Sequence, residues 1–194
     1  MKSDPDKHHR RSIRLQGYDY ASPGAYFVTI CTHQRQCLFG AVVEGELRLN
    51  AFGQMVNACW QRLPFHFPHL NLDAFVTMPN HVHGILILTD SGRGEAFGTE
   101  RVGQSENHCS NASPLRPRGT TPGSIGAIVQ NFKSVSAQRM NRRCQPNTIK
   151  IWQRNYYEHI VRNEISLQHL RQYIQNNPLS WKEDQLHPDV PSKW

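Results

Sequence analysis

The sequence predicts an α+β protein in which antiparallel strands and helices share one domain. Short runs rich in β-branched and aromatic residues are separated by turn residues, as the strands of hairpins are. Longer stretches carry apolar residues every three to four positions, which is the period of an amphipathic helix. Because neighbouring strands are joined by short turns, we expect them to pair antiparallel, and this favours the α+β class.

The predicted strands begin after Pro23-Gly24, where residues 25–32 are mostly β-branched or aromatic. The turn Pro79-Asn80 separates two runs that we expect to be adjacent antiparallel strands. The full set of predicted strands is 25–32, 38–43, 47–49, 72–78, 81–88 and 149–152, with a further short run near 159–161.

Three amphipathic helices are predicted. The first follows Asn50, a residue suited to capping a helix N-terminus, and stops at Pro64. The second begins at Ser124. The last covers about 164–176, is ended by Pro178, and has an apolar stripe formed by Ile165, Leu167, Leu170 and Ile174.

The chain divides into three parts by composition. We expect a basic flexible arm over residues 1–22, one folded domain over 23–181, and a polar tail over 182–194. Within the domain, residues 89–122 are rich in Gly, Ser, Asn and Pro, which predicts a mobile insertion. The chain lacks a run of about 18 apolar residues and a signal peptide, so we expect a cytoplasmic protein that does not span a membrane.

Two features of composition bear on function. The five cysteines are irregularly spaced and form no CxxC pair, which argues against a disulfide framework or a zinc knuckle. The net charge is +7, and no acidic residue lies between Glu106 and Glu158. A one-signed basic stretch attracts a polyanion, although a solvated basic surface is the alternative. We therefore predict a nucleic-acid partner, with DNA-binding candidates Lys133, Arg139, Arg142, Arg143 and Arg154.

The strongest local pattern is Pro79-Asn80-His81-Val82-His83-Gly84, at the head of an apolar strand. Strand side chains alternate between faces, so His81 and His83 point the same way, roughly 7 Å apart. Two imidazoles at this spacing can chelate one divalent ion, whereas two structural histidines are the alternative.

A second pattern lies on the last predicted helix, where Tyr173 and Asn177 are one turn apart and share a face. Two histidines and the amide oxygen of Asn177 would give a metal three ligands and leave positions open for a phosphate. The phenol of Tyr173 could then attack that phosphate and form a covalent phosphotyrosine. A tyrosine at the rim of a core is the alternative interpretation, and Tyr156 and Tyr157 are rival nucleophiles that lack such an amide partner.

These patterns resemble the single-tyrosine HUH transposases, whose motif is a histidine, a bulky hydrophobe and a histidine. Residues 79–84 resemble that motif, and Tyr173 with Asn177 resembles the catalytic helix of the REP-associated tyrosine transposases. Residues 24–32, 123–134 and 152–163 are similar to the same family, so that the resemblance extends from about Arg11 to Trp181. Mobile relatives usually have Gln at the position of Asn177, and the Asn favours the REP-associated branch.

The resemblance implies a ferredoxin-like antiparallel sheet of about five strands flanked by helices, as in HUH endonucleases. It implies Mg²⁺ or Mn²⁺ held by His81, His83 and Asn177, with Tyr173 as the nucleophile. The implied substrate is single-stranded or hairpin DNA, nicked and rejoined by a monomer or a homodimer. A non-cutting DNA-binding module of the same fold is the alternative. A small-molecule hydrolase is disfavoured because the further Asp and His clusters of such enzymes are missing.

Overall fold

The computed structural model describes residues 15, 17–90 and 120–190. Most of the predicted basic arm and residues 91–119 of the predicted mobile insertion therefore lie outside the described residues. Residues 17–22 of the arm are described, and Tyr18 and Tyr20 pack against the core around Tyr26. Within the described part of the chain, no helix has the length and apolar content needed to cross a bilayer.

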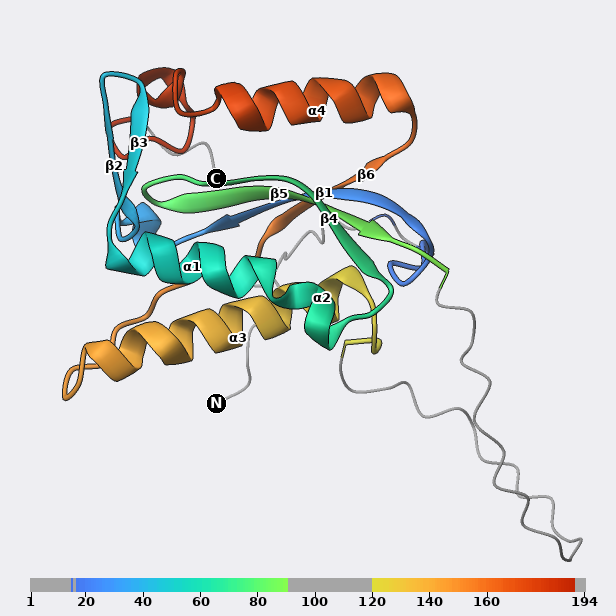
Figure 1. Ribbon diagram of the computed structural model, residues 1–194, viewed down its shortest axis with the longest axis horizontal. Coiled ribbons are helices and arrows are strands. Elements are labelled where there is room, and N and C mark those ends of the chain that lie inside the picture. Colours follow the sequence, from blue (N-terminus) through green and yellow to red (C-terminus); the bar gives the residue numbers. More distant parts are fainter. Residues whose placement is uncertain (1–14, 16, 91–119, 191–194) are drawn as a thin grey trace, which may run out of the picture.

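The main sheet has four antiparallel strands in the order β4-β5-β1-β6 (Figure 1). Their bounds are β1 Gly24–Cys31, β4 Leu70–Thr77, β5 His81–Leu88 and β6 Tyr157–Val161. Two further strands, β2 Gly40–Val43 and β3 Glu46–Leu49, form a separate hairpin. The α+β class and the antiparallel pairing are confirmed, and the described residues place four strands in the main sheet where about five were expected.

Helices cover both faces of the sheet (Figure 1). The bounds are α1 Ala51–Gln61, α2 Leu63–His66, α3 Ile125–Arg143 and α4 Glu164–Asn176, with short 3₁₀ turns η2 His33–Arg35 and η3 Trp181–Glu183. Helices α1, α2 and α3 lie on one face, and α4 lies alone on the other. The predicted cap Asn50 accepts from the amides of Phe52 and Gly53. The second helix begins next to the predicted Ser124, whose side chain accepts from the amide of Ala127.

Strand β5 supplies side chains to both faces of the sheet. Val82 and Leu86 enter the larger core beneath the sheet, which includes Trp60 of α1 and Phe132 of α3. Ile85 and Ile87, which alternate with them, face α4 and join a smaller core with Phe27 and Ile174. Gly84 is required here because a Cβ at this position would collide with the Trp60 ring. The two-residue period of β5 thus places its histidines on the α4 side.

Three elements differ from their prediction. Pro64 does not end helical structure, because it lies in the first turn of α2, where its missing amide hydrogen is not needed. Residues 149–152 form no strand, and only an isolated bridge joins Trp152 to Thr32. Ile165 of α4 is 71% exposed, so the buried stripe of this helix consists of the later apolar residues.

Candidate metal and tyrosine centre

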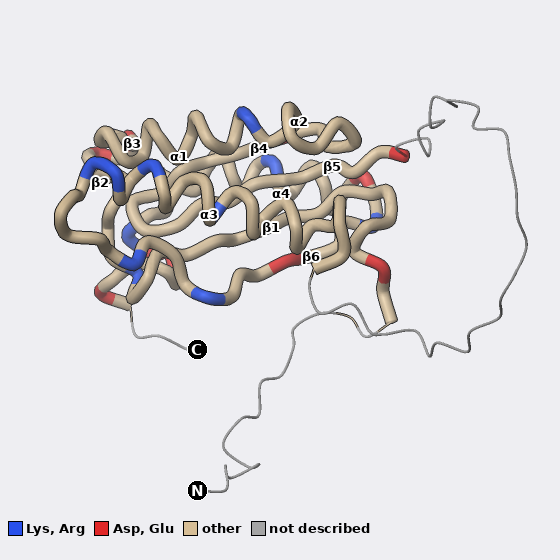
Figure 2. The backbone as a smooth tube through the Cα atoms, turned by 90° about the horizontal axis from the view of Figure 1, so that it is seen from below, with Lys and Arg blue, Asp and Glu red and all other residues tan. Residues whose placement is uncertain are grey.

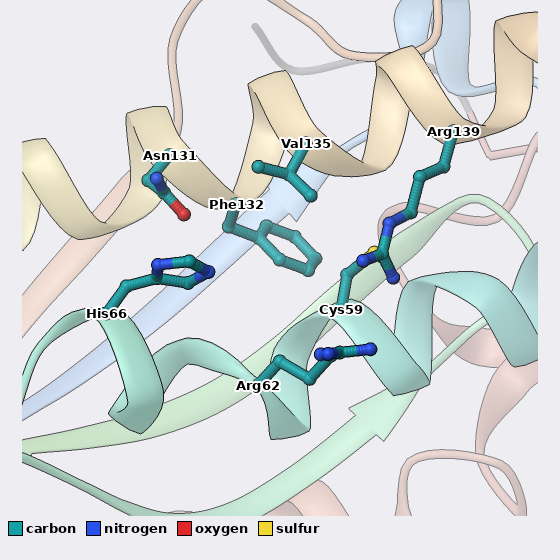
Figure 3. Close-up of a pocket in the computed structure, with 7 residues that line it drawn as sticks. All are labelled: Cys59, Arg62, His66, Asn131, Phe132, Val135 and Arg139. Carbon is teal, nitrogen blue, oxygen red and sulfur yellow. The ribbon is translucent and has the colours of Figure 1, made fainter.

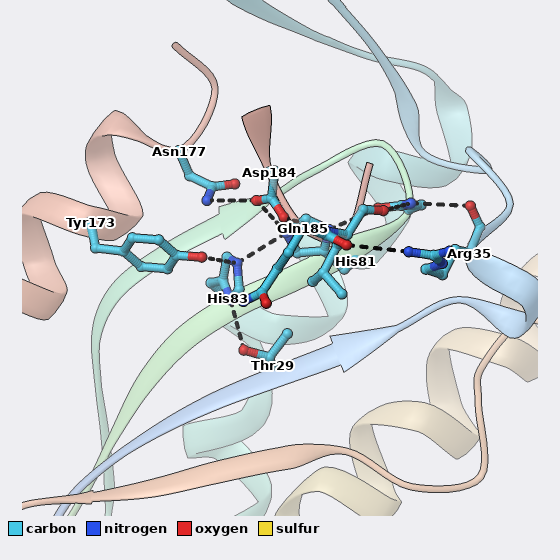
Figure 4. A network of polar contacts seen from close by, with 10 residues as sticks. Thr29, Arg35, His81, His83, Tyr173, Asn177, Asp184 and Gln185 are labelled. Carbon is cyan, nitrogen blue, oxygen red and sulfur yellow. Dashed lines mark hydrogen bonds and ion pairs between the residues drawn. The ribbon is translucent and has the colours of Figure 1, made fainter. Parts of the chain in front are cut away.

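The histidine pair, His81 and His83, lies on β5, one of the two inner strands of the sheet. Both side chains are buried, with 0% and 2% of their residue surface exposed. Their Nε2 atoms are 3.0 Å apart on the face of the sheet that α4 covers (Figure 4). The two imidazoles therefore face each other as predicted. They are more deeply buried than residues at the start of a strand usually are.

Asn80 sets the proton position on His81. Its Nδ2 donates to the carbonyl oxygens of Arg35 and Leu186, so its Oδ1 is left to accept. The His81 Nδ1 lies 2.8 Å from that oxygen and must donate to it. This places the lone pair of His81 on Nε2, the atom that faces His83, and such partners are typical of metal-ligating histidines.

Thr29 is the hydrogen-bond partner of His83 Nδ1. The register of β1 and β5 places Thr29 opposite His83, and its Oγ1 is 2.8 Å from Nδ1. A hydroxyl can donate or accept, so His83 can hold its proton on either nitrogen. Burial lowers the pKa of His81 to about 3 and holds that of His83 well below its usual range. Both imidazoles are therefore neutral, which is the form that binds metal.

Tyr173 extends from α4 toward the histidine pair. Its hydroxyl lies 3.2 Å from His83 Nε2, and the two rings meet edge to face with centroids 5.1 Å apart (Figure 4). Tyr173 is nevertheless 42% exposed, so the hydroxyl can be reached from solvent. Burial of the hydroxyl end, followed by the nearby Asp184 carboxylate, raises the pKa of Tyr173 to about 12. The phenol is protonated at neutral pH.

Asn177 follows α4 at its C-cap and is 3% exposed. Its Nδ2 donates to Asp184 Oδ2 at 3.1 Å, whereas its buried Oδ1 has no hydrogen-bond partner. A buried carbonyl oxygen without a donor is costly unless another ligand reaches it. The structure thus brings together all four predicted centre residues, and it leaves one oxygen of Asn177 free to bind a cation.

Asp184 was not among the predicted site residues. His81, His83 and Asp184 form a buried group that could hold a metal ion, with one ligand atom from each within 4.8 Å of the others. In the sequence, Asp184 lies in a polar stretch far from the two histidines, and no periodic pattern relates it to them. Its carboxylate was the one feature that could have suggested a metal ligand. Folding residues 182–190 back over the sheet brings it into the site.

An ion pair holds α4 against the edge strand of the sheet. A bulge in β4 between Leu72 and Phe75 contains Asp73. The guanidinium of Arg171 donates to both carboxylate oxygens of Asp73, with Nε at 3.0 and 3.1 Å and a second nitrogen at 2.6 Å. Such a two-pronged pair restrains orientation as well as distance. Arg171 is two residues before Tyr173, so this pair restrains the part of α4 that carries the tyrosine.

The rival tyrosines occupy different faces of the sheet. Tyr157 lies on β6 opposite Thr29, on the same face as the histidine pair, with its ring centroid 6.5 Å from that of Phe27. Tyr156 instead lies beside Lys133 of α3 on the opposite face. The contact with His83 belongs to Tyr173.

The predicted DNA-binding residues do not surround the histidine pair. Lys133, Arg139, Arg142 and Arg143 are on α3, which covers the other face of the sheet (Figures 1 and 2). Lys133 Nζ donates to three carbonyls of the loop before β6, those of Gln153, Arg154 and Asn155. Burial lowers the pKa of Lys133 to about 8. Its ammonium group therefore holds this loop in place.

The arginines of this face differ in their surroundings. Arg139 lies in a small pocket between α1, α2 and α3, with a guanidinium nitrogen 3.6 Å from the Cys59 sulfur (Figure 3). Arg142 and Arg143, at the end of α3, are exposed. Arg154 is exposed as well and borders an open pocket of about 460 Å³ beside α3. The exposed guanidiniums are the ones available to a polyanion.

Together the fold and the site define a histidine and tyrosine centre on an inner strand of an antiparallel sheet. A family model described as "Transposase IS200 like" matches residues 118–177. A Haemophilus influenzae protein, described as an uncharacterized protein, is 42% identical over 184 residues, covering 94% of this chain and 95% of that protein. The chain belongs to the IS200-like transposase family.

One solved structure shares the fold. The structure of a REP-associated tyrosine transposase bound to a REP hairpin is similar, with a TM-score of 0.51 and 17% identity over 94% of this chain and 91% of that one. A crystal structure of a putative transposase from Deinococcus radiodurans R1 gives a TM-score of 0.43 and 20% identity over 84% and 95%. The family match supports a transposase-like function for this protein.

Proposed function

We propose that this protein is a metal-dependent enzyme that nicks and rejoins single-stranded DNA through a covalent phosphotyrosine on Tyr173. The observation that carries the proposal is the contact between the Tyr173 hydroxyl and the buried pair of neutral imidazoles, 3.2 Å from His83 Nε2. The proposed substrate is hairpin-forming, REP-like DNA, which is supported by the fold shared with a transposase solved on a REP hairpin.

The residues of the site fit a divalent cation such as Mg²⁺ or Mn²⁺. His81 directs a lone pair from Nε2, His83 can do so with its proton on Nδ1, and Asn177 offers an unpartnered oxygen. These would be the ligands. When bound, such a cation supplies electrophilic assistance, because it draws charge from the phosphoryl oxygens of the DNA. Metal binding would also use the His83 lone pair, so the Tyr173 hydroxyl would be released from it.

In the proposed cleavage step, Tyr173 Oη attacks phosphorus and forms a phosphotyrosine bond. The phosphodiester bond to one deoxyribose oxygen breaks, that oxygen leaves as a hydroxyl, and the phenolic proton passes to solvent. Attack by a DNA hydroxyl on the phosphotyrosine reverses these bond changes and rejoins a strand. Because the linkage is an ester of similar energy, no external energy source is needed for rejoining.

A covalent protein–DNA band is the direct test of this function. The full chain is incubated with hairpin-bearing oligonucleotides and Mn²⁺, and the products are separated under denaturing conditions. We expect a band of protein with attached DNA that chelator prevents. The non-cutting DNA-binding module, the alternative function, predicts a gel shift under native conditions without that band.

The ion pair between Asp73 and Arg171 gives a prediction about positioning. In Arg171→Gln we expect adduct formation to slow by about tenfold, because a small displacement of a reacting group is costly. Metal binding at the histidine pair should be unchanged. Glu164→Gln is the matched control, because Glu164 contacts the same guanidinium from an exposed position. An unchanged rate in Arg171→Gln would show that apolar packing alone positions α4.

A second prediction concerns the exposed arginines at the end of α3. Neutralising Arg142 and Arg143 to Gln should weaken DNA binding for all sequences and reduce the slope of log affinity against log salt by about 2. The reason is that each phosphate contact releases condensed counterions. Binding is measured by fluorescence anisotropy at several salt concentrations, with Lys182→Gln, an exposed residue beside the site, for comparison. The same slope in the double variant would place the DNA elsewhere.

A further inference from the structure

Residues 181–190, the C-terminal segment, pack directly over the histidine pair. The Trp181 ring lies beside that of His81, with centroids 5.9 Å apart. The Arg35 guanidinium donates to the carbonyls of Gln185 and Val190, and Asn80 Nδ2 donates to that of Leu186 (Figure 4). The Asn80 contact links this segment to His81, because the same amide fixes the proton on His81 Nδ1.

Asp184 is the charged group that this segment brings into the site. It is 9% exposed, and its Oδ2 lies 4.0 Å from His81 Nε2. One carboxylate oxygen accepts from the Leu186 amide at 2.6 Å, and the other accepts from Asn177 at 3.1 Å. Neither donor carries a charge. The His81 atom that faces the carboxylate bears a lone pair, so it does not offset the negative charge either.

A carboxylate buried among neutral groups is costly unless a cation reaches it. The carboxylate of Asp184, which has no positive partner among the described residues, and the lone pairs of the histidine nitrogens lie in the same part of the site. Ligand atoms of Asp184 and the two histidines lie within 4.8 Å of one another. Asn177, whose Oδ1 has no hydrogen-bond partner, adjoins this group through its bond to Asp184. Carboxylate oxygens are ligands that Mg²⁺ and Mn²⁺ prefer.

We propose that Asp184 is an anionic ligand of the metal held by His81 and His83, and that the C-terminal segment is therefore part of the metal site. This inference rests on the proposed function, because it concerns the same metal. It also predicts that metal binding and the docking of the C-terminal segment depend on each other. A ligand that is present only when the segment is docked couples the two equilibria, so metal binding stabilises docking and docking strengthens metal binding to the same extent.

Metal affinity tests the inference without any measurement of DNA cleavage. Binding of Mn²⁺ to the full chain is followed by the loss of the paramagnetic resonance signal of free Mn²⁺. Asp184→Asn keeps the shape of the side chain and removes its charge, and we expect it to weaken Mn²⁺ binding on the order of 100-fold. Asp189→Asn is the matched control in the same segment, since the Asp189 side chain is 90% exposed and should leave the affinity unchanged.

Hydrogen exchange, measured on the unmodified chain and on Asp184→Asn, is a second test. We expect Mn²⁺ to slow amide exchange in residues 181–190, and to lose this effect in Asp184→Asn. If His81→Ala abolishes Mn²⁺ binding but Asp184→Asn binds Mn²⁺ as the parent does, the inference fails and the metal role of the histidines stands. If His81→Ala retains the parent affinity, the metal site of the proposed function fails as well.

Discussion

Tyr173→Phe is expected to abolish the covalent protein–DNA adduct, with cleavage reduced by about 10⁴-fold or more. The substitution removes only the oxygen that we propose attacks phosphorus. The ring keeps its edge-to-face contact with His83 and with Phe27. DNA binding should therefore persist, and the free energy of unfolding should fall by only about 0.5–1.5 kcal/mol for the lost hydrogen bond. The adduct is measured on denaturing gels, and stability by chemical denaturation.

The matched controls are Tyr157→Phe and Tyr156→Phe. Tyr157 shares the face of the histidine pair, so it is the stronger rival, whereas Tyr156 lies beside Lys133 on the opposite face. Both variants should form the adduct. If Tyr173→Phe still forms the adduct and Tyr157→Phe does not, the nucleophile is on β6 and the proposed role of α4 is wrong.

The histidine substitutions have the second large expected effect. His81→Ala and His83→Ala should each abolish Mn²⁺-dependent cleavage, because each removes a nitrogen ligand from the proposed metal site. Both histidines are buried, so truncation also leaves partners without a hydrogen bond, at Asn80 in one case and Thr29 in the other. We expect a loss of about 1–3 kcal/mol in the free energy of unfolding.

Metal binding and cleavage are measured at a temperature where far-ultraviolet circular dichroism shows each variant to be folded. His66→Ala is the control, because His66 is exposed on α2 at the opposite face of the sheet. Its affinity for Mn²⁺ and its cleavage rate should equal those of the parent. Full cleavage by the double histidine variant in the presence of chelator would contradict the metal role of the pair.

Local patterns were sufficient to predict the parts of the centre that lie within one element. The two-residue period of a strand places His81 and His83 on one face, whatever the strand packs against. The turn of a helix likewise brings Tyr173 and Asn177 to neighbouring positions on α4. The cap residue Asn50 and the helix start at Ser124 are also local, because each side chain bonds to amides of the next few residues. These predictions needed no knowledge of the tertiary structure.

Only the tertiary structure showed which elements meet. Asp184 lies beside His81 because the chain returns over the sheet after α4, and no periodicity relates two residues so far apart in sequence. Lys133 belongs to a basic stretch, but its ammonium group is satisfied by carbonyls of a loop about 20 residues away. The tertiary structure also decided which face of the sheet α3 covers. Side-chain periodicity is set by backbone geometry within an element, whereas burial, charge pairing and partner choice depend on long-range packing.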